Sequence, residues 1–159
     1  MDRRALLGTI GTSSIVALTG CLGGDVGTPS GNRTASATPT PAPTPALNDS
    51  EFEVTSTRGG TETDSATVAV NGHNVVVEGT TWGRNGCQTA ELDSVNYDGD
   101  TLTVAVATTR RDDAGDACTQ GIVEISYRAT VEFENGRPST VVVTHDRGDG
   151  PETVVTTSP

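Results

Sequence analysis

Lysine is absent from this sequence of 159 residues, and all ten basic residues are arginine. Aromatic residues make up only 3% of the chain, and its 33% apolar content is low for a globular protein. The 21 acidic residues give a formal net charge of -11. A chain of this charge has little with which to neutralise phosphate groups, so we expect no nucleic-acid partner.

High acidity with few aromatic residues fits two kinds of chain. One is a disordered chain that buries too little apolar surface to fold. The other is a protein with a densely carboxylated surface that folds in concentrated salt, where the Debye length is about 3 Å and self-repulsion is screened. Regular strand patterning in the second half of the chain favours the folded alternative.

The apolar N-terminal stretch is too short to span a membrane. It covers residues 5–18, behind Arg3 and Arg4, whereas a spanning helix needs about 20 predominantly apolar residues. A charged start, an apolar middle and small residues at its end are the layout of a targeting segment. We therefore assign residues 1–20 to a signal peptide; the alternative is a signal anchor that stays uncleaved.

Two motifs in this leader resemble those of exported lipoproteins. Residues 2–7, in which Arg3 and Arg4 precede Ala5 and two leucines, resemble the twin-arginine export motif. The run Leu18-Thr19-Gly20-Cys21 resembles a lipobox, and this resemblance implies a lipid on the thioether of Cys21. A lipid with two chains is sufficient for stable anchoring, whereas a single chain holds only marginally.

Together with the acidic, lysine-free composition, the leader resembles those of secreted lipoproteins of halophilic archaea. The resemblance implies export of an already folded protein, membrane contact through Cys21 and a location on the extracytoplasmic face of the cell membrane. Such lipoproteins include blue-copper carriers, whose site needs two His, a nearby Cys and usually a Met. His73 and His145 are the only histidines, Cys118 lies far from His145, and no methionine follows Met1. We expect no metal and no cofactor.

Residues 21–50 form the expected spacer between the lipid and a folded domain at 51–159. The spacer is rich in Gly, Thr, Ser, Ala and Pro, and residues 38–45 alternate between proline and small residues. Repeated prolines fix φ and remove hydrogen-bond donors, which predicts an extended, disordered stalk. Asn32 and Asn48 begin N-glycosylation sequons within it.

Apolar and polar side chains alternate along most of residues 51–159, which is the period of a half-buried strand. The clearest strand is predicted at residues 122–134, and seven more at 52–57, 67–70, 74–81, 90–97, 101–108, 139–145 and 153–157. The apolar phase slips between Leu92 and Val95, which predicts a bulge. Asn-Gly or Asp-Gly pairs at 71–72, 98–99 and 135–136 predict tight hairpins. The expected fold is all-β, a small antiparallel sandwich or barrel of seven to eight strands.

Cys87 and Cys118 form an even pair once Cys21 is assigned to the lipid. In an exported domain such a pair predicts a disulfide, with two free or metal-binding thiols as the alternative. An immunoglobulin domain places its tryptophan between the cysteines, whereas Trp82 precedes both. We expect Trp82 to pack in the core or at its rim, or else to face a ligand.

The sequence offers little catalytic or metal-binding chemistry. The acidic runs 112–116 and 146–150 lack the alternating Asp/Asn loop ending in Glu that binds calcium, so solvated loops are expected. No Gly-x-Ser-x-Gly turn, His-Glu-x-x-His pair or phosphate-binding Gly loop is present. We expect His145, beside Asp146 at a strand end, to be structural or on the surface, and His73 to be exposed. An enzyme is therefore not expected.

Three functions stay open for the domain. A binding or cell-envelope role would be favoured by a contiguous exposed apolar or aromatic patch near Trp82. An accessory subunit or weakly recognisable enzyme would require His73 or His145 to converge with Asp or Ser side chains in one cleft. An inhibitor-like domain would present the loop at 87–90, or the loop before Cys118, as a rigid protrusion secured by the disulfide.

Overall fold

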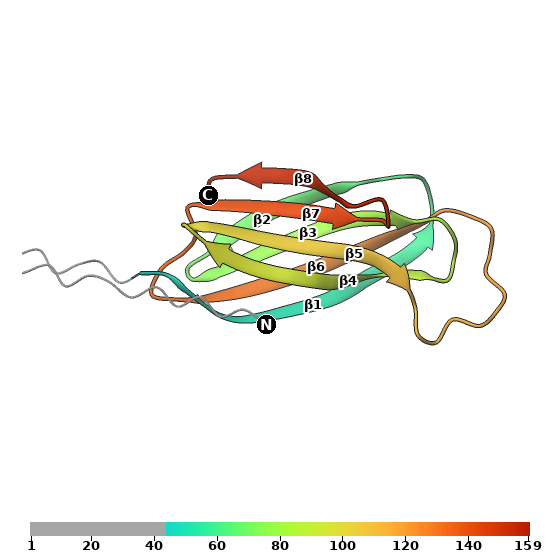
Figure 1. Cartoon of the computed structure of the whole chain (residues 1–159), viewed down its shortest axis with the longest axis horizontal. Coiled ribbons are helices and arrows are strands. Elements are labelled where there is room, and N and C mark those ends of the chain that lie inside the picture. The colour runs from blue at the N-terminus through green and yellow to red at the C-terminus, as the bar shows by residue number, and fades with distance from the viewer. Residues whose placement is uncertain (1–43) are drawn as a thin grey trace, which may run out of the picture. The chain divides into compact units, whose positions relative to one another are not determined.

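The computed structural model describes residues 44–159, which form two four-stranded β-sheets packed face to face (Figure 1). The predicted all-β sandwich is confirmed. The leader with Arg3, Arg4 and Cys21, and the sequon at Asn32, lie outside the described residues. The strands are β1 (Ala46–Gly59), β2 (Ser65–Asn71), β3 (Asn74–Gly83), β4 (Gln88–Asp98), β5 (Thr101–Arg110), β6 (Val123–Glu134), β7 (Thr140–Asp146) and β8 (Pro151–Thr157).

The first sheet has the order β1-β6-β3-β2 and the second the order β4-β5-β7-β8. Neighbouring strands are antiparallel in every pair except β5 and β7, which are parallel. The expected antiparallel sandwich therefore contains one parallel pair of strands. The reason is that the chain leaves β5 in the second sheet and runs back along β6 in the first sheet. Strand β7 therefore enters the second sheet in the same direction as β5.

Two of the three predicted turn pairs form hairpins. Gly72 has a φ of 63° between β2 and β3, and Gly99 and Asp100 have φ values of 52° and 67° between β4 and β5. Asn135 and Gly136 also have positive φ, but they lead from β6 into β7 of the other sheet. A local turn signal predicts a change of direction, and it does not predict which sheet the chain enters next.

Strand β1 begins at Ala46, earlier than the domain boundary expected at residue 51. Its first residues pair with the end of β6, although their composition does not favour a strand. Asn48, expected in the spacer, therefore lies in the folded domain as an exposed residue at a register shift between Leu47 and Asp49. The bulge predicted in β4 is confirmed by a register shift between Leu92 and Ser94.

The core between the sheets is built mainly from small aliphatic side chains, which accounts for the low aromatic content. Inward-facing residues of β6 form its centre, where Tyr127 is the largest buried side chain. Burying a side chain of valine size contributes about 1.5 kcal/mol or more. The remaining core residues with no more than 1% exposure are Val75, Val77, Leu102, Val104, Val106, Ile125, Ala129, Val131, Val141 and Val143.

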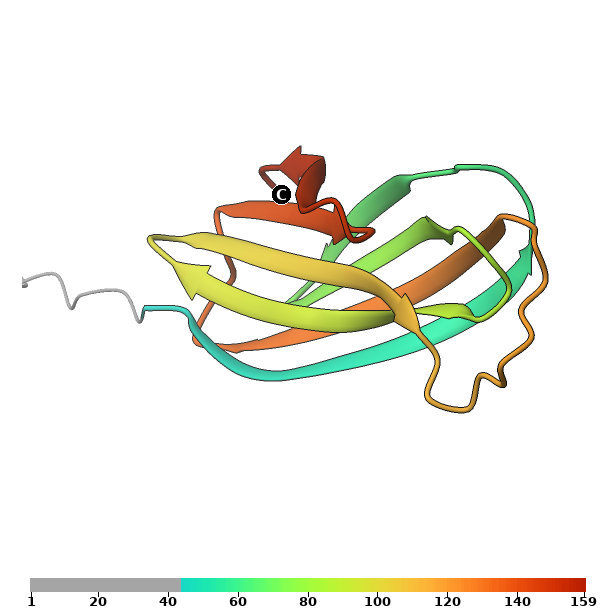
Figure 2. The same cartoon turned by 45° about the vertical axis from the view of Figure 1, so that its right-hand side comes forward.

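The two ends of the sandwich differ, as Figures 1 and 2 show. One end carries tight turns at 72–73 and 99–100, the connection 135–139 and the start of β1, where Pro45 packs against Gly136. We call this the turn end and the other the loop end. It carries four connections, at residues 60–64, 84–87, 111–122 and 147–150.

Candidate functional site

Residues 60–64 cross the loop end from one edge of the first sheet to the other, because β1 and β2 are its two edge strands. We call this segment the strap. Strands β6 and β3 lie between its ends, so the strap covers about 14 Å of strand spacing. An extended chain reaches about 20 Å between Gly59 and Ser65, so the strap is long enough to cross these strand ends.

The first anchor of the strap is the carboxylate of Glu124, at the start of β6. It accepts hydrogen bonds from Arg58 Nε (3.0 Å) and Nη2 (2.8 Å), from the Thr61 N–H (3.2 Å) and hydroxyl (3.1 Å), and from the Thr63 hydroxyl (2.7 Å). These donors, above all the Thr63 hydroxyl, lower the pKa of Glu124 to about 2. A Cβ at Gly60 would overlap the Glu124 side chain, so the strap approaches it as closely as a glycine backbone permits.

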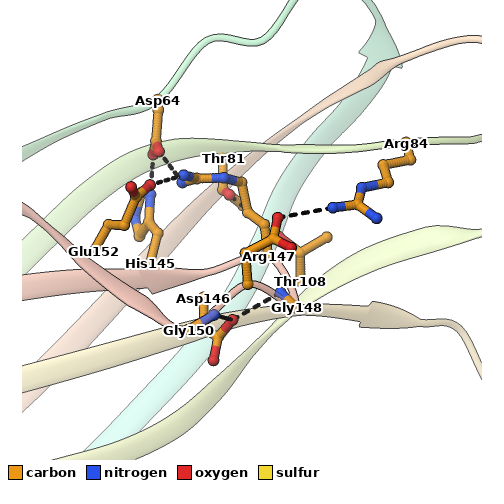
Figure 3. Close-up of polar contacts among 11 residues, drawn as sticks. Asp64, Thr81, Arg84, Thr108, His145, Asp146, Arg147, Gly148, Gly150 and Glu152 are labelled. Atoms are coloured by element: carbon orange, nitrogen blue, oxygen red, sulfur yellow. Dashed lines mark hydrogen bonds and ion pairs between the residues drawn. The ribbon is translucent and has the colours of Figure 1, made fainter.

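The second anchor is Asp64, the last residue of the strap (Figure 3). One of its carboxylate oxygens contacts Nδ1 of His145, and Nε2 of His145 lies 2.7 Å from the Tyr127 hydroxyl. A carboxylate only accepts hydrogen bonds, so in the neutral imidazole Nδ1 donates to Asp64 and Nε2 accepts from Tyr127. His145 is completely buried. Burial lowers its pKa and outweighs the opposing effect of Asp64, and burial also raises the pKa of Tyr127.

Arg147 covers this anchor from the connection between β7 and β8. Its guanidinium bridges the other oxygen of Asp64 to Glu152 of β8, and its Cζ lies 5.5 Å from the centre of the Trp82 ring. The Arg147 side chain is 15% exposed, whereas that of Glu152 is 68% exposed. Trp82 is half-buried at the rim, as one of the sequence-based alternatives predicts, and the cation–π contact adds to its packing.

Further polar contacts order the neighbouring connections (Figure 3). The carboxylate of Asp146 points away from His145 and accepts from the N–H groups of Gly148 (2.7 Å) and Gly150 (3.1 Å). Arg84 pairs with Asp149 at 2.8 Å. The run 146–150, read above as a solvated loop, is therefore a turn closed by its own first side chain. Within residues 44–159, no three His, Cys, Asp or Glu side chains converge as metal ligands would.

His145 is the histidine that converges with an aspartate, but the enzyme hypothesis also required a cleft, and this imidazole is completely buried. The partner is Asp64, whereas His73 lies exposed in the β2–β3 turn. Both ring nitrogens of His145 contact protein groups, and the ring is buried beneath the strap and Arg147. A substrate could reach the imidazole only if the strap moved, so the geometry in this state is that of a structural polar network.

The predicted disulfide between Cys87 and Cys118 is present, with a Cα–Cα distance of 5.4 Å. It holds the connection 111–122, which projects beyond the strands in Figures 1 and 2. Backbone bonds from Arg111 N to Cys87 O (2.9 Å) and from Gly86 N to Thr119 O (3.1 Å) close the base of this loop. Strand β4 already begins at Gln88, so the other loop proposed from the sequence, at 87–90, is mostly strand.

Outside the loop end, the outer face of the first sheet has a groove of about 570 Å³, lined by Glu51, Phe52, Glu53, Arg128 and Thr130. Arg128 is already paired with Glu78 at 2.8 Å. Among the described residues the exposed large apolar side chains are Leu47 and Val54, both on β1. The described surface therefore lacks the apolar or aromatic patch near Trp82 that would favour a binding role.

Sequence reasoning missed two central residues of this site, Asp64 and Arg147. Asp64 lies in a polar run between strands, and Arg147 was read only as part of an acidic loop; neither position carries a local signal. No helix in the described part of the chain is long and apolar enough to cross a membrane. Comparison with known protein families, curated proteins and solved structures gave no significant match to this chain.

Proposed function

We propose that the protein is a membrane-anchored extracytoplasmic lipoprotein whose β-sandwich serves as a binding or cell-envelope component. The observation that carries this proposal is the order of two motifs in one leader, Arg3-Arg4 followed by Leu18-Thr19-Gly20-Cys21. The disulfide supports it, because such bonds persist in oxidising compartments. Strand β1 begins at the turn end of the sandwich, opposite the loop end.

Fractionation of cells that express Cys21→Ser tests the anchor. The wild-type protein is expected in the membrane fraction with a lipid mass on Cys21, and the variant in the medium. A double Arg3→Lys, Arg4→Lys variant is the matched control for export, and it should keep the precursor inside the cell. Unchanged membrane retention of Cys21→Ser, with an unmodified thiol in the wild type, would contradict the proposal.

Capture of partners by the lipidated protein in concentrated salt tests the binding role. One stoichiometric partner that is lost when the loop end is altered would identify an assembly component. A suitable altered variant is Arg84→Ala, because its ion pair with Asp149 is on the surface and its loss should leave the stability within about 1 kcal/mol. A matched control at the turn end is Arg137→Ala.

The disulfide-held loop favours a second candidate, an inhibitor-like domain. The projecting residues 112–117 are small or acidic, and they are held at both sides by the Cys87–Cys118 bond and the backbone bonds at its base. Replacing 112–117 by a short Gly-Ser linker, with both cysteines kept, should leave the fold intact and abolish capture of a protein partner. Capture that is equal before and after the replacement would contradict this candidate.

A further inference from the structure

The two anchors of the strap differ in how they depend on protons. At the Glu124 anchor, five hydrogen bonds reach a carboxylate that stays ionised until very low pH. At the Asp64 anchor, the contact runs to a buried imidazole that must be neutral to accept from Tyr127. The Glu124 anchor therefore holds the strap as far as Thr63, whereas Asp64, next to the first residue of β2, is held by its contacts with His145 and Arg147.

We propose that the strap is a proton-sensitive latch, which releases Asp64 as the pH falls and thereby frees the Arg147 guanidinium that lies over Trp82. The Glu124 anchor acts as the hinge side of this latch. Trp82 pairs with Glu124 across β3 and β6, and Arg147 lies between Trp82 and Asp64, so the aromatic ring sits between the two anchors.

Charged and titratable groups face His145 from four elements. They are Tyr127 of β6, Asp64 of the strap, Arg147 of the β7–β8 connection and, beyond the Arg147 guanidinium, Glu152 of β8. A proton added to Nε2 of His145 would face the Tyr127 hydroxyl. The hydroxyl hydrogen would then have to rotate away from the imidazole inside the core. It would also place an imidazolium beside the Arg147 guanidinium. Burial and this like charge together lower the pKa of His145 in the closed state, although Asp64 opposes them.

In the open state the imidazole is hydrated and titrates near its ordinary pKa of about 6.5. Each opening event then takes up one proton below that pH, because the closed state binds it less well. The opening equilibrium constant should therefore rise as the pH falls below about 6.5, by at most about tenfold per pH unit, and level off where the closed state also takes up the proton.

Opening has a direct consequence for the surface of the loop end. When Asp64 leaves, Arg147 loses one of its two carboxylate partners and the cover over Trp82 is loosened. The closed state lacks an exposed aromatic surface here, so the latch would make a cationic and aromatic surface available only in acid. Trp82 is the single tryptophan of the chain and reports this change directly.

Amide hydrogen exchange of a peptide spanning residues 62–68, corrected for the intrinsic pH dependence of exchange, tests the latch in the full-length protein. In the wild type the opening constant should rise severalfold on acidification from about pH 6.5 to about pH 4.5. In His145→Gln, which keeps a polar side chain without a titrating group, the same constant should be nearly flat. The Thr61 amide at the Glu124 anchor is the internal control and should change little. A flat wild-type profile, or an equal slope in His145→Gln, would overturn the proposal.

Asp64→Asn tests the same proposal if His145→Gln does not fold. It keeps the length of the strap and removes the charge that Arg147 contacts. At neutral pH the strap peptide should exchange faster, and Trp82 fluorescence should be quenched more by acrylamide, than in the wild type. Wild-type protection and wild-type quenching in a folded Asp64→Asn variant would show that Asp64 does not hold the strap.

Discussion

The carboxylate of Asp64 contacts the imidazole of His145 although 81 residues separate them in the sequence. This contact joins the end of the strap, which belongs to the first sheet, to β7 of the second sheet. It also provides a hydrogen-bond acceptor for Nδ1 of His145, whose side chain is completely buried. Among the described residues no buried side-chain nitrogen or oxygen lacks a hydrogen-bond partner, so the polar network is complete.

Tyr127→Phe should destabilise the domain by about 1–3 kcal/mol, because it leaves Nε2 of the buried His145 without a donor. Urea unfolding at neutral pH measures the change. Tyr97→Phe is the matched control: its hydroxyl bonds to Asp100 on the surface, so its loss should cost about 0.5 kcal/mol or less. Equal costs for the two variants would contradict the structural role of the buried hydroxyl.

Glu124→Gln should remove an acid-dependent part of the stability. The pKa of Glu124 is lowered to about 2 in the folded state, so its contribution is present above the unfolded value of about 4.3 and is lost as the pH falls towards 2. The variant should therefore be less stable than the wild type at neutral pH, and the difference should shrink between about pH 4.3 and about pH 2. Denaturant unfolding across this range measures it. Glu132→Gln, on the same strand but exposed, is the matched control and should change the stability little at neutral pH.

Gly79→Ala should destabilise the domain by about 1–3 kcal/mol through overpacking. A Cβ at position 79 would overlap the Tyr127 hydroxyl and displace it from His145. Gly59→Ala provides the control, because a Cβ at that position meets nothing within 4 Å. Thermal unfolding compares the two, and a Gly79→Ala protein as stable as Gly59→Ala would show that Tyr127 can shift without cost.

Removal of the disulfide by a double Cys87→Ala, Cys118→Ala substitution should cost about 3–4 kcal/mol. The bond joins residues 31 apart, and a loop of this length restricts the unfolded chain by about that amount. Unfolding of the oxidised wild type, the reduced wild type and the variant measures the cost. Reduced wild type and variant should agree; a reduced wild type as stable as the oxidised protein would contradict the expectation.

The strands were predictable because their signal is local. The alternation along β6 and β5 indicated which residues face inward, and glycine at 72 and 99 indicated where hairpins close. The disulfide followed from an even pair of cysteines. The early start of β1 was not predictable, since residues 46–50 join the sheet through pairing with β6 rather than through their own propensity.

Most contacts of the candidate site could not be predicted from local sequence patterns. Nothing near Asp64 or Arg147 in the sequence indicates a partner, and His145 was expected only to be structural or at the surface. Their contact depends on three things: β1 and β2 lie at opposite edges of one sheet, β7 pairs parallel to β5, and the connection of five residues must cross between those edges.

The sequence by itself determined the acidic surface, the strand periodicity, the positive-φ turns and the cysteine pair, because each depends on residue type and short spacing. Only the tertiary structure decided which strands pair, which histidine is buried and which aspartate reaches it. Pairing between distant segments depends on the free energy of packing the whole core, and no short stretch of residues carries that information.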